Sequence, residues 1–255
     1  MTKDQCAEIS GIVSTSLDEA ERVWINVGHY FCANESVLNR AMTKASVPSQ
    51  IPGHPIIEDG RPKVDDFIAL VVDIRGATRH LLQRISEHVT RVTELQRVFY
   101  ETAALLPSCA VAIGYEKGAV TEYLGDGLLA LFRAGEADRP SAIYAAHRAA
   151  TNCLEALRKV INPVLNSRYQ LPNLSIGIGM AYSRAIVTIV GTEKFQQPKA
   201  FGHCVFYATK LAHGENEIVV DKAMKMIWPT AEDGKISFRD KRFGDYSGYL
   251  LEESA

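Results

Sequence analysis

Two aspartates have the residue type and the setting for metal chemistry. Asp73 lies near the end of the short apolar run FIALVVDI, and Asp126 follows Gly125 between two further apolar runs. Two converging carboxylates, with room for water and phosphate oxygens, are ligands that Mg²⁺ or Mn²⁺ prefers. Either aspartate alone is more often a helix cap or a turn residue. The pair therefore predicts a divalent metal site if the fold brings both carboxylates to one point.

The segment IRGAT, directly after the first aspartate, is suited to phosphate. It leads from a predicted strand into a predicted helix. Backbone N–H groups of Gly76, Ala77 and Thr78 at such a helix start can hold a phosphate. We therefore predict a phosphate-binding loop beside the metal site. Arg75 and Arg79 border this loop and are either phosphate ligands or solvated surface charges.

The apolar patterns predict the elements that must position these residues. Short runs rich in β-branched residues predict buried strands, and apolar residues at helical spacing predict helices. The expected elements are a strand (67–74), a helix (78–106) ended by Pro107, a hairpin (119–124 and 127–132), a helix (140–164), a strand pair (174–182 and 185–190) and a final strand (245–251). This order is typical of an α+β, ferredoxin-like (split βαβ) fold, whose mainly antiparallel sheet is covered on one face by helices. The first strand and the hairpin are neighbours in such a sheet, so both aspartates would meet.

The chain ahead of this domain divides into two parts. Residues 1–45 predict a helical extension, with a capping box at Ser16 and Glu19 and a second short helix from Asn34. Residues 46–65 hold four prolines and predict a Pro-rich linker. Residues 66–255 form the main domain.

Composition excludes several classes of protein. The 255 residues are 47% hydrophobic and 23% charged, and no apolar run is long enough to span a bilayer. The net charge of −2 lacks the basic excess of a nucleic-acid binder. No apolar leader begins the chain, and its five cysteines are scattered without CxxC spacing. We expect a reduced, cytoplasmic protein that binds no zinc, no nucleic acid and no membrane.

Three segments in order resemble the class III nucleotidyl cyclases. VVDIRGATRHL resembles their first metal motif and EYLGDGLLALF their second. LSIGIGMAYSRAIVTIVGTEKFQQPKAFGHCVFYATKLA resembles their later strand pair, loop and interface helix. The resemblance implies a homodimer with composite active sites. It also implies two Mn²⁺ or Mg²⁺ ions, held by Asp73, the Ile74 carbonyl and Asp126, that promote attack of the ribose 3′-hydroxyl on the α-phosphate of a nucleoside triphosphate. The products are a 3′,5′-cyclic nucleotide and pyrophosphate.

The same resemblance assigns substrate-binding positions. Glu122 and Lys199 stand where the family reads the base, with charges reversed relative to an adenylate cyclase. Lys210 replaces an arginine that stabilises the transition state, and Phe206 replaces an asparagine that orients the ribose.

Two further positions near the last predicted strand carry positive charge. Lys241 and Arg242 lie where cyclases often keep a lysine for the triphosphate. A solvated charge pair on a turn is an equally good reading of these two residues.

With both aspartates retained, the altered positions resemble the bacterial pyrimidine cyclases of antiphage defence. Uracil offers an N3–H donor to Glu122 and an O4 acceptor to Lys199, whereas the N3 of cytosine carries no proton. We therefore rank UTP ahead of CTP, and expect the product to act as a second messenger for a separate effector. Two alternatives stay open. One is a guanylate cyclase, indicated by Glu122; the other is a silent cyclase-like module that binds nucleotide or dimerises, indicated by Phe206 and Lys210.

Overall fold

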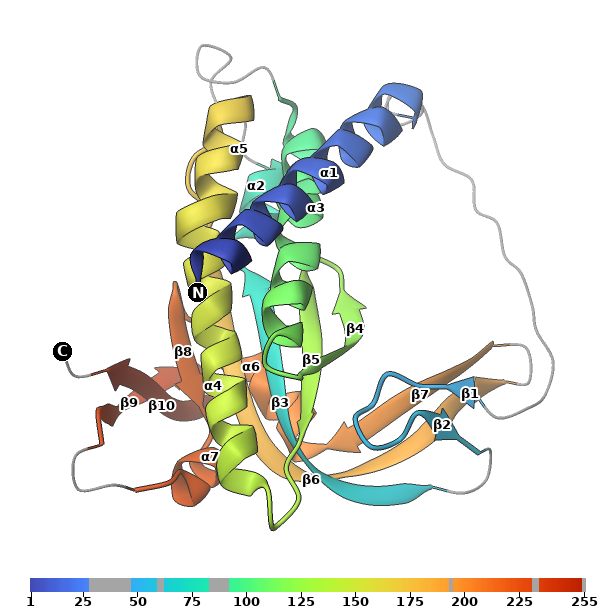
Figure 1. Cartoon of the computed structure of the whole chain (residues 1–255), viewed down its shortest axis with the longest axis vertical. Helices are drawn as coiled ribbons and strands as arrows, with labels where there is room; N and C mark the ends of the chain where they lie inside the picture. The colour runs from blue at the N-terminus through green and yellow to red at the C-terminus, as the bar shows by residue number, and fades with distance from the viewer. Residues whose placement is uncertain (28–46, 59–61, 83–91, 193–194, 231–233, 254–255) are drawn as a thin grey trace.

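A computed structural model describes residues 1–27, 47–58, 62–82, 92–192, 195–230 and 234–253 (Figure 1). The elements before the middle of the chain are α1 (Lys3–Val27), β1 (Val47–Pro48), β2 (Ile56–Ile57), β3 (Lys63–Ile74), α2 (Ala77–Leu82), α3 (Glu94–Gly114), β4 (Ala119–Leu124) and β5 (Gly127–Arg133). Those after it are α4 (Arg139–Ala156), the π-helix η2 (Leu157–Ile161), α5 (Asn162–Tyr169), β6 (Ile176–Thr192), β7 (Phe195–Gly202), α6 (His203–Leu211), β8 (Glu217–Val220), α7 (Lys222–Ile227), β9 (Ile236–Phe243) and β10 (Tyr246–Glu253). Among the described residues, no helix has both the length and the apolar character needed to cross a membrane.

The main sheet confirms the predicted fold class. Its eight strands follow the order β4-β5-β3-β6-β8-β10-β9, with β7 paired to β6. The first four strands of this order are antiparallel to each neighbour, which is the arrangement of a split βαβ unit. Strand β8 then joins parallel to β6, and the β9–β10 hairpin extends the sheet beyond the predicted core.

Strand β3 is buried on both faces, as its apolar run predicts. Ile68, Leu70 and Val72 belong to the core under α1, α3 and α4, whereas Phe67 and Val71 belong to a second core under α6. The expectation that helices cover one face only is therefore incomplete, because α6 packs on the other face.

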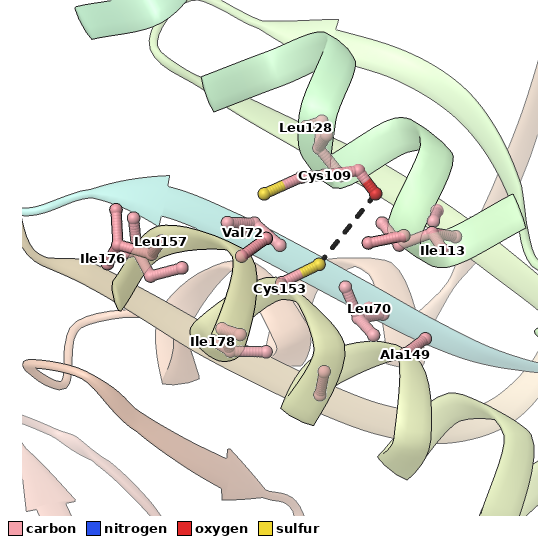
Figure 2. Close-up of a cluster of buried hydrophobic side chains, with 14 of the residues drawn as sticks. Leu70, Val72, Cys109, Ile113, Leu128, Ala149, Cys153, Leu157, Ile176 and Ile178 are labelled. Carbon is pink, nitrogen blue, oxygen red and sulfur yellow. Dashed lines mark hydrogen bonds between the residues drawn. The ribbon is translucent and has the colours of Figure 1, made fainter. Parts of the chain in front are cut away.

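The larger core holds two adjacent cysteine side chains between α3 and α4, beside Leu70 and Val72 of β3 (Figure 2). The Cys153 thiol donates to the Cys109 carbonyl over 3.9 Å. A side-chain hydrogen bond with Cys109 and complete burial raise the pKa of the Cys153 thiol. Because the thiolate is the reactive form, this cysteine is a packing residue.

Helix α6 approaches β6 more closely than side chains would allow. A Cβ atom on Gly179 would lie 2.0 Å from the Ala208 carbonyl oxygen, and one on Gly177 would lie 2.2 Å from that of Ala212. Both distances are far below van der Waals contact. The IGIG segment, residues 176–179, is therefore the surface on which the α6 backbone packs, and it sets the position of that helix.

The N-terminal boundaries differ from the prediction. Helix α1 begins at Lys3, so Ser16 lies inside it and is not an N-cap. The apolar residues that face the core, Ile9, Val13 and Leu17, start well before Ser16. The second helix expected from Asn34 lies outside the described residues.

The segment expected to be a linker, 46–65, carries regular structure. It contains the two-stranded β1–β2 ribbon and the first residues of β3, which begins at Lys63 and not at Phe67. The ribbon is held to the domain because Ile51 and Ile57 are buried in the core under α6.

Two internal boundaries were also wrong. Pro107 does not end a helix but lies inside α3, because residues on both sides of it, such as Leu105 and Cys109, are buried in the same core. The expected strand pair 174–182 and 185–190 is one strand, β6, whose hairpin partner is β7. Ser183 and Arg184 do not form a turn because both stay paired with β3.

The close packing of α6 on Gly179 leads to a prediction about stability. Gly179→Ala should destabilise the fold by about 1–3 kcal/mol, because the added methyl group meets a helix backbone that cannot give way. Gly11→Ala is the matched control, since Gly11 lies in α1 with nothing within 4 Å of an added Cβ. This control should stabilise the fold by about 0.5–1 kcal/mol. Urea unfolding followed by circular dichroism measures both changes, and equal stability of G179A and wild type would contradict the close approach.

Candidate functional site

The sheet places Asp73 and Asp126 next to each other. Asp73 pairs in register with Gly127 of β5, and Asp126 immediately precedes Gly127 in the β4–β5 turn. A Cβ atom on Gly127 would lie 3.2 Å from Asp73 Oδ1, so the absence of a side chain there leaves room for the carboxylate. Both aspartates are partly accessible to solvent. A ligand can therefore reach both carboxylates from the end of β3.

The charges around Asp73 favour a cation. Burial and the negative charge of Asp126 raise the pKa of Asp73, while the charges of Arg75 and His213 lower it. Arg75 Nη1 donates to Asp73 Oδ2 over 2.9 Å and to the Ala212 carbonyl over 3.3 Å. Two partly desolvated carboxylates with a backbone carbonyl nearby form a set of hard oxygen donors, which fits Mg²⁺ or Mn²⁺.

Within the described ranges, no group of three or more His, Cys, Asp or Glu side chains converges. A metal ion bound by Asp73 and Asp126 would therefore need further oxygen ligands. A backbone carbonyl, water and substrate phosphate are the oxygen donors that complete such sites.

The predicted phosphate loop turns from β3 into α2. Gly76 has a φ of +75°, which glycine adopts without strain, and its carbonyl accepts from the His80 N–H over 2.9 Å. The Arg75 N–H donates to the Ser175 carbonyl over 2.8 Å, which ties the loop to the start of β6. Ala77 and Thr78 form the first turn of α2, a helix of only 6 residues.

A buried ion-pair network that the sequence analysis missed anchors α2. His80 Nδ1 lies 2.8 Å from Glu101 Oε2, and Arg97 Nε donates to Glu101 Oε1 over 2.8 Å. Glu101 is 1% exposed, and each of its two carboxylate oxygens contacts one of these partners. The i, i+4 spacing of Arg97 and Glu101 was the only sequence signal, and it is equally common on solvated helix faces.

Glu122 of β4 and Lys199 of β7 form an ion pair with each other. The pair connects β4, at one edge of the sheet, to β7, which pairs with the second half of β6. Both side chains are partly buried. The two residues assigned to base recognition therefore lie together, with a hydrogen-bond acceptor beside a donor.

Lys210, on the exposed side of α6, lines a cleft of about 540 Å³, which is also lined by Arg75, the ion-pair partner of Asp73. The cleft lies between the loop after β3, the end of α6 and the β9–β10 turn. Its lining residues are Arg75, Lys210, His213, Phe243, Gly244, Asp245 and Tyr246. The Lys210 ammonium lies 5.5 Å from the centre of the Tyr246 ring, close enough for a cation–π contact. Sequence reasoning did not identify His213 or Tyr246.

Lys241 and Arg242 do not line this cleft. Lys241 Nζ donates to Glu217 Oε1 over 2.6 Å, and Arg242 is exposed. Glu217 aligns with Gly177, which aligns with Asp73, so two strand spacings, about 10 Å, separate Glu217 from Asp73. The structure therefore brings together the acidic pair, the loop after it and Lys210, and holds Lys241 elsewhere in an ion pair.

Solved structures with similar folds are cyclase domains. The guanylyl cyclase Cya2 has a TM-score of 0.59 and 19% identity, over 76% of this chain and 94% of its own. The adenylyl cyclase CyaB from P. aeruginosa has a TM-score of 0.57 and 16% identity, over 76% of this chain and 97% of its own. A class III adenylyl cyclase-like ATP-binding protein from Pseudomonas aeruginosa has a TM-score of 0.59 and 17% identity, over 75% of this chain and 41% of its own.

Sequence comparison adds nothing to this likeness, because no protein-family model and no curated protein matches the chain. At these identities the likeness is one of fold. The chain has the fold of the class III adenylyl and guanylyl cyclase domains.

Proposed function

We propose that this protein is a nucleotidyl cyclase, which converts a nucleoside triphosphate into a 3′,5′-cyclic nucleotide and pyrophosphate. The observation that carries the proposal is the pairing of β3 with β5, which sets Asp73 beside Asp126. Arg75, which forms an ion pair with Asp73, lines a cleft that also holds Lys210. The cyclase fold supports the proposal. This chemistry asks the protein for positioning and charge stabilisation more than for a nucleophile of its own.

In this proposal each part of the site has one task. Asp73, Asp126 and the Ile74 carbonyl hold two Mn²⁺ or Mg²⁺ ions, which when bound neutralise phosphate charge and acidify the 3′-hydroxyl. The N–H groups of Gly76, Ala77 and Thr78 hold a phosphate. Lys210 provides the positive charge that stabilises the transition state, as a point charge and not the planar fork of an arginine.

Lys241 and Arg242 are proposed as further triphosphate contacts. Lys241 would exchange its Glu217 partner for a phosphate, so this contact has a cost that the loop amides do not have. Arg242 has no such constraint, since it is exposed.

We propose that the active form is a homodimer with composite sites, in which Lys210 acts on the site that holds Asp73 of the other chain. The outer face of α6 supports this, because Phe206 is 65% exposed and Tyr207 is also exposed beside Lys210. Large apolar side chains in such a position suit an interface. A single chain offers a second arrangement, since its own cleft contains both Arg75 and Lys210.

We propose a pyrimidine substrate, UTP first and CTP next. The Glu122–Lys199 pair presents an acceptor beside a donor, which complements the adjacent N3–H and O4 of uracil. Cytosine has an acceptor and a donor in the opposite order. Guanine shares the N–H and C=O order of uracil, so a guanylate cyclase that uses GTP is the alternative to a pyrimidine cyclase. The altered ribose and transition-state positions, Phe206 and Lys210, favour UTP over GTP.

The biological role that we propose is synthesis of a second messenger in antiphage defence, read by a separate effector. It rests on the resemblance of these altered positions to the bacterial pyrimidine cyclases. A silent nucleotide-binding module would instead give no product with any substrate.

The substrate test is incubation of the purified protein with ATP, GTP, CTP and UTP separately, in Mn²⁺, with cyclic products resolved by mass spectrometry. We expect cyclic UMP as the main product, because only UTP matches the paired groups without a purine ring. If cyclic GMP is the main product, the substrate is GTP and not UTP. The absence of any cyclic product would reject the cyclase proposal in favour of the silent module.

The acidic pair is tested by Asp73→Asn and Asp126→Asn. Each change should lower turnover at least about 100-fold, because charge stabilisation at the reacting phosphate is lost while side-chain volume is kept. Asp138→Asn is the matched control, since Asp138 is exposed and makes no side-chain cap bond at the start of α4. Circular dichroism verifies folding, and full activity of D73N would refute the assignment of Asp73.

Composite sites are tested by mixing two inactive chains, Asp73→Ala and Lys210→Ala. Half of the randomly assembled dimers contain one whole site of two, so about a quarter of wild-type activity should return. Each variant assayed alone is the control. No recovery after verified subunit exchange would favour the single-chain arrangement.

A further inference from the structure

The ion pair between Arg75 and Asp73 occupies one of the two carboxylate oxygens of a residue that the proposed function assigns to a metal ion. We propose that Arg75 is an exchangeable substitute for the cation. Its guanidinium holds the Asp73 carboxylate when no metal is present, and it transfers to a substrate phosphate when the metal binds. This inference rests on the proposed function for the metal and the phosphate, and concerns what this chain's own arginine does.

The contact has the geometry of a specific ion pair. Arg75 Nη1 lies 2.9 Å from Asp73 Oδ2, and the side chains are 27% and 33% exposed. Partial burial keeps solvent from screening the pair fully. A divalent ion on Asp73 would face the guanidinium charge at close range, so both cannot keep the same carboxylate oxygen. Metal binding and the Arg75 contact therefore compete.

The same guanidinium ties the acidic site to α6. Arg75 Nη1 also donates to the Ala212 carbonyl over 3.3 Å, just after the last turn of α6. Lys210 lies two residues before Ala212. Release of Arg75 from Asp73 would also free this carbonyl, which links occupancy of the acidic site to the helix that carries Lys210.

The Arg75 side chain can move to a new partner without a change in its backbone position. Its N–H is fixed by the Ser175 carbonyl, whereas its side chain already lines the cleft beside Asp73. A guanidinium presents several donors in a plane and binds phosphate oxygens in pairs. A triphosphate in that cleft would therefore offer Arg75 a replacement for the carboxylate that it gives up.

The test is binding of Mn²⁺ alone, without nucleotide, measured from the electron paramagnetic resonance signal of the free ion. Arg75→Gln should bind Mn²⁺ about tenfold more tightly than wild type, because the competing charge is removed. Arg79→Gln is the matched control. Arg79 lies in α2 with its guanidinium near Gly76 and makes no hydrogen bond to Asp73, so its effect should stay within about twofold. Arg75→Lys keeps a charge that can pair with Asp73 and should stay near wild type.

A second measurement, of pyrophosphate binding, should show an effect of the opposite sign to the effect on Mn²⁺ binding. In saturating Mn²⁺, the affinity of Arg75→Gln for inorganic pyrophosphate should fall about five- to tenfold, because a phosphate ligand is lost. If Arg75 had only a structural role, its replacement would weaken the binding of both Mn²⁺ and pyrophosphate. Thermal melting of each variant identifies any that fails to fold. If R75Q does not fold, the comparison of R75K with wild type in pyrophosphate binding becomes decisive. A loss smaller than the five- to tenfold predicted for R75Q is then expected, because an ammonium cannot bind phosphate oxygens in pairs, and no loss would overturn the inference.

The outcomes separate this inference from the proposed function. If Asp73→Asn keeps wild-type Mn²⁺ affinity, the metal assignment in the proposed function is wrong. If Asp73→Asn loses Mn²⁺ but Arg75→Gln binds it no better than wild type, only the inference about Arg75 is overturned. Equal binding by wild type and R75Q, including no binding by either, also overturns it.

Discussion

Strand β3 runs through the centre of the molecule with its apolar residues packed on both faces, and the site depends on this double burial. Because side chains alternate along a strand, a slip of one residue against β5 or β6 would exchange the two cores. Neither core would accept the other's side chains, so the pairing of Asp73 with Gly127 on one side and Gly177 on the other is held firmly. The acidic pair thus inherits its geometry from packing that has no part in chemistry.

The second constraint is the close packing of α6 on the glycines of β6. Without side chains at Gly177 and Gly179, the helix backbone lies directly on the strand, and its last turn comes close to the end of β3. This is how Lys210 and Arg75 come to line one cleft although they are 135 residues apart in the sequence. The β9–β10 turn closes the cleft with Tyr246.

The charged groups of the site are arranged in layers. Asp73 and Asp126 repel each other at the end of the sheet, Arg75 balances part of their charge, and Lys210 stands farther along the cleft. Behind the loop, the buried carboxylate of Glu101 pins α2 to α3. A protein that positions a highly charged phosphate chain needs a fixed frame of this kind, since mobile charges would reorganise at each step.

Local sequence patterns determined the parts of this protein that depend on near neighbours. The run FIALVVDI identified a strand buried on both faces, and the Gly125-Asp126 turn between apolar runs identified a hairpin, because turn chemistry and apolar periodicity act over a few residues. Tertiary structure decided the rest. Pro107 stays inside α3 and Ser183 stays inside β6 because long-range packing and pairing outweigh their local preferences. The contacts of Lys199 with Glu122 and of Lys241 with Glu217 likewise join strands that are far apart in the chain and are not neighbours in the sheet, and no local pattern encodes that arrangement.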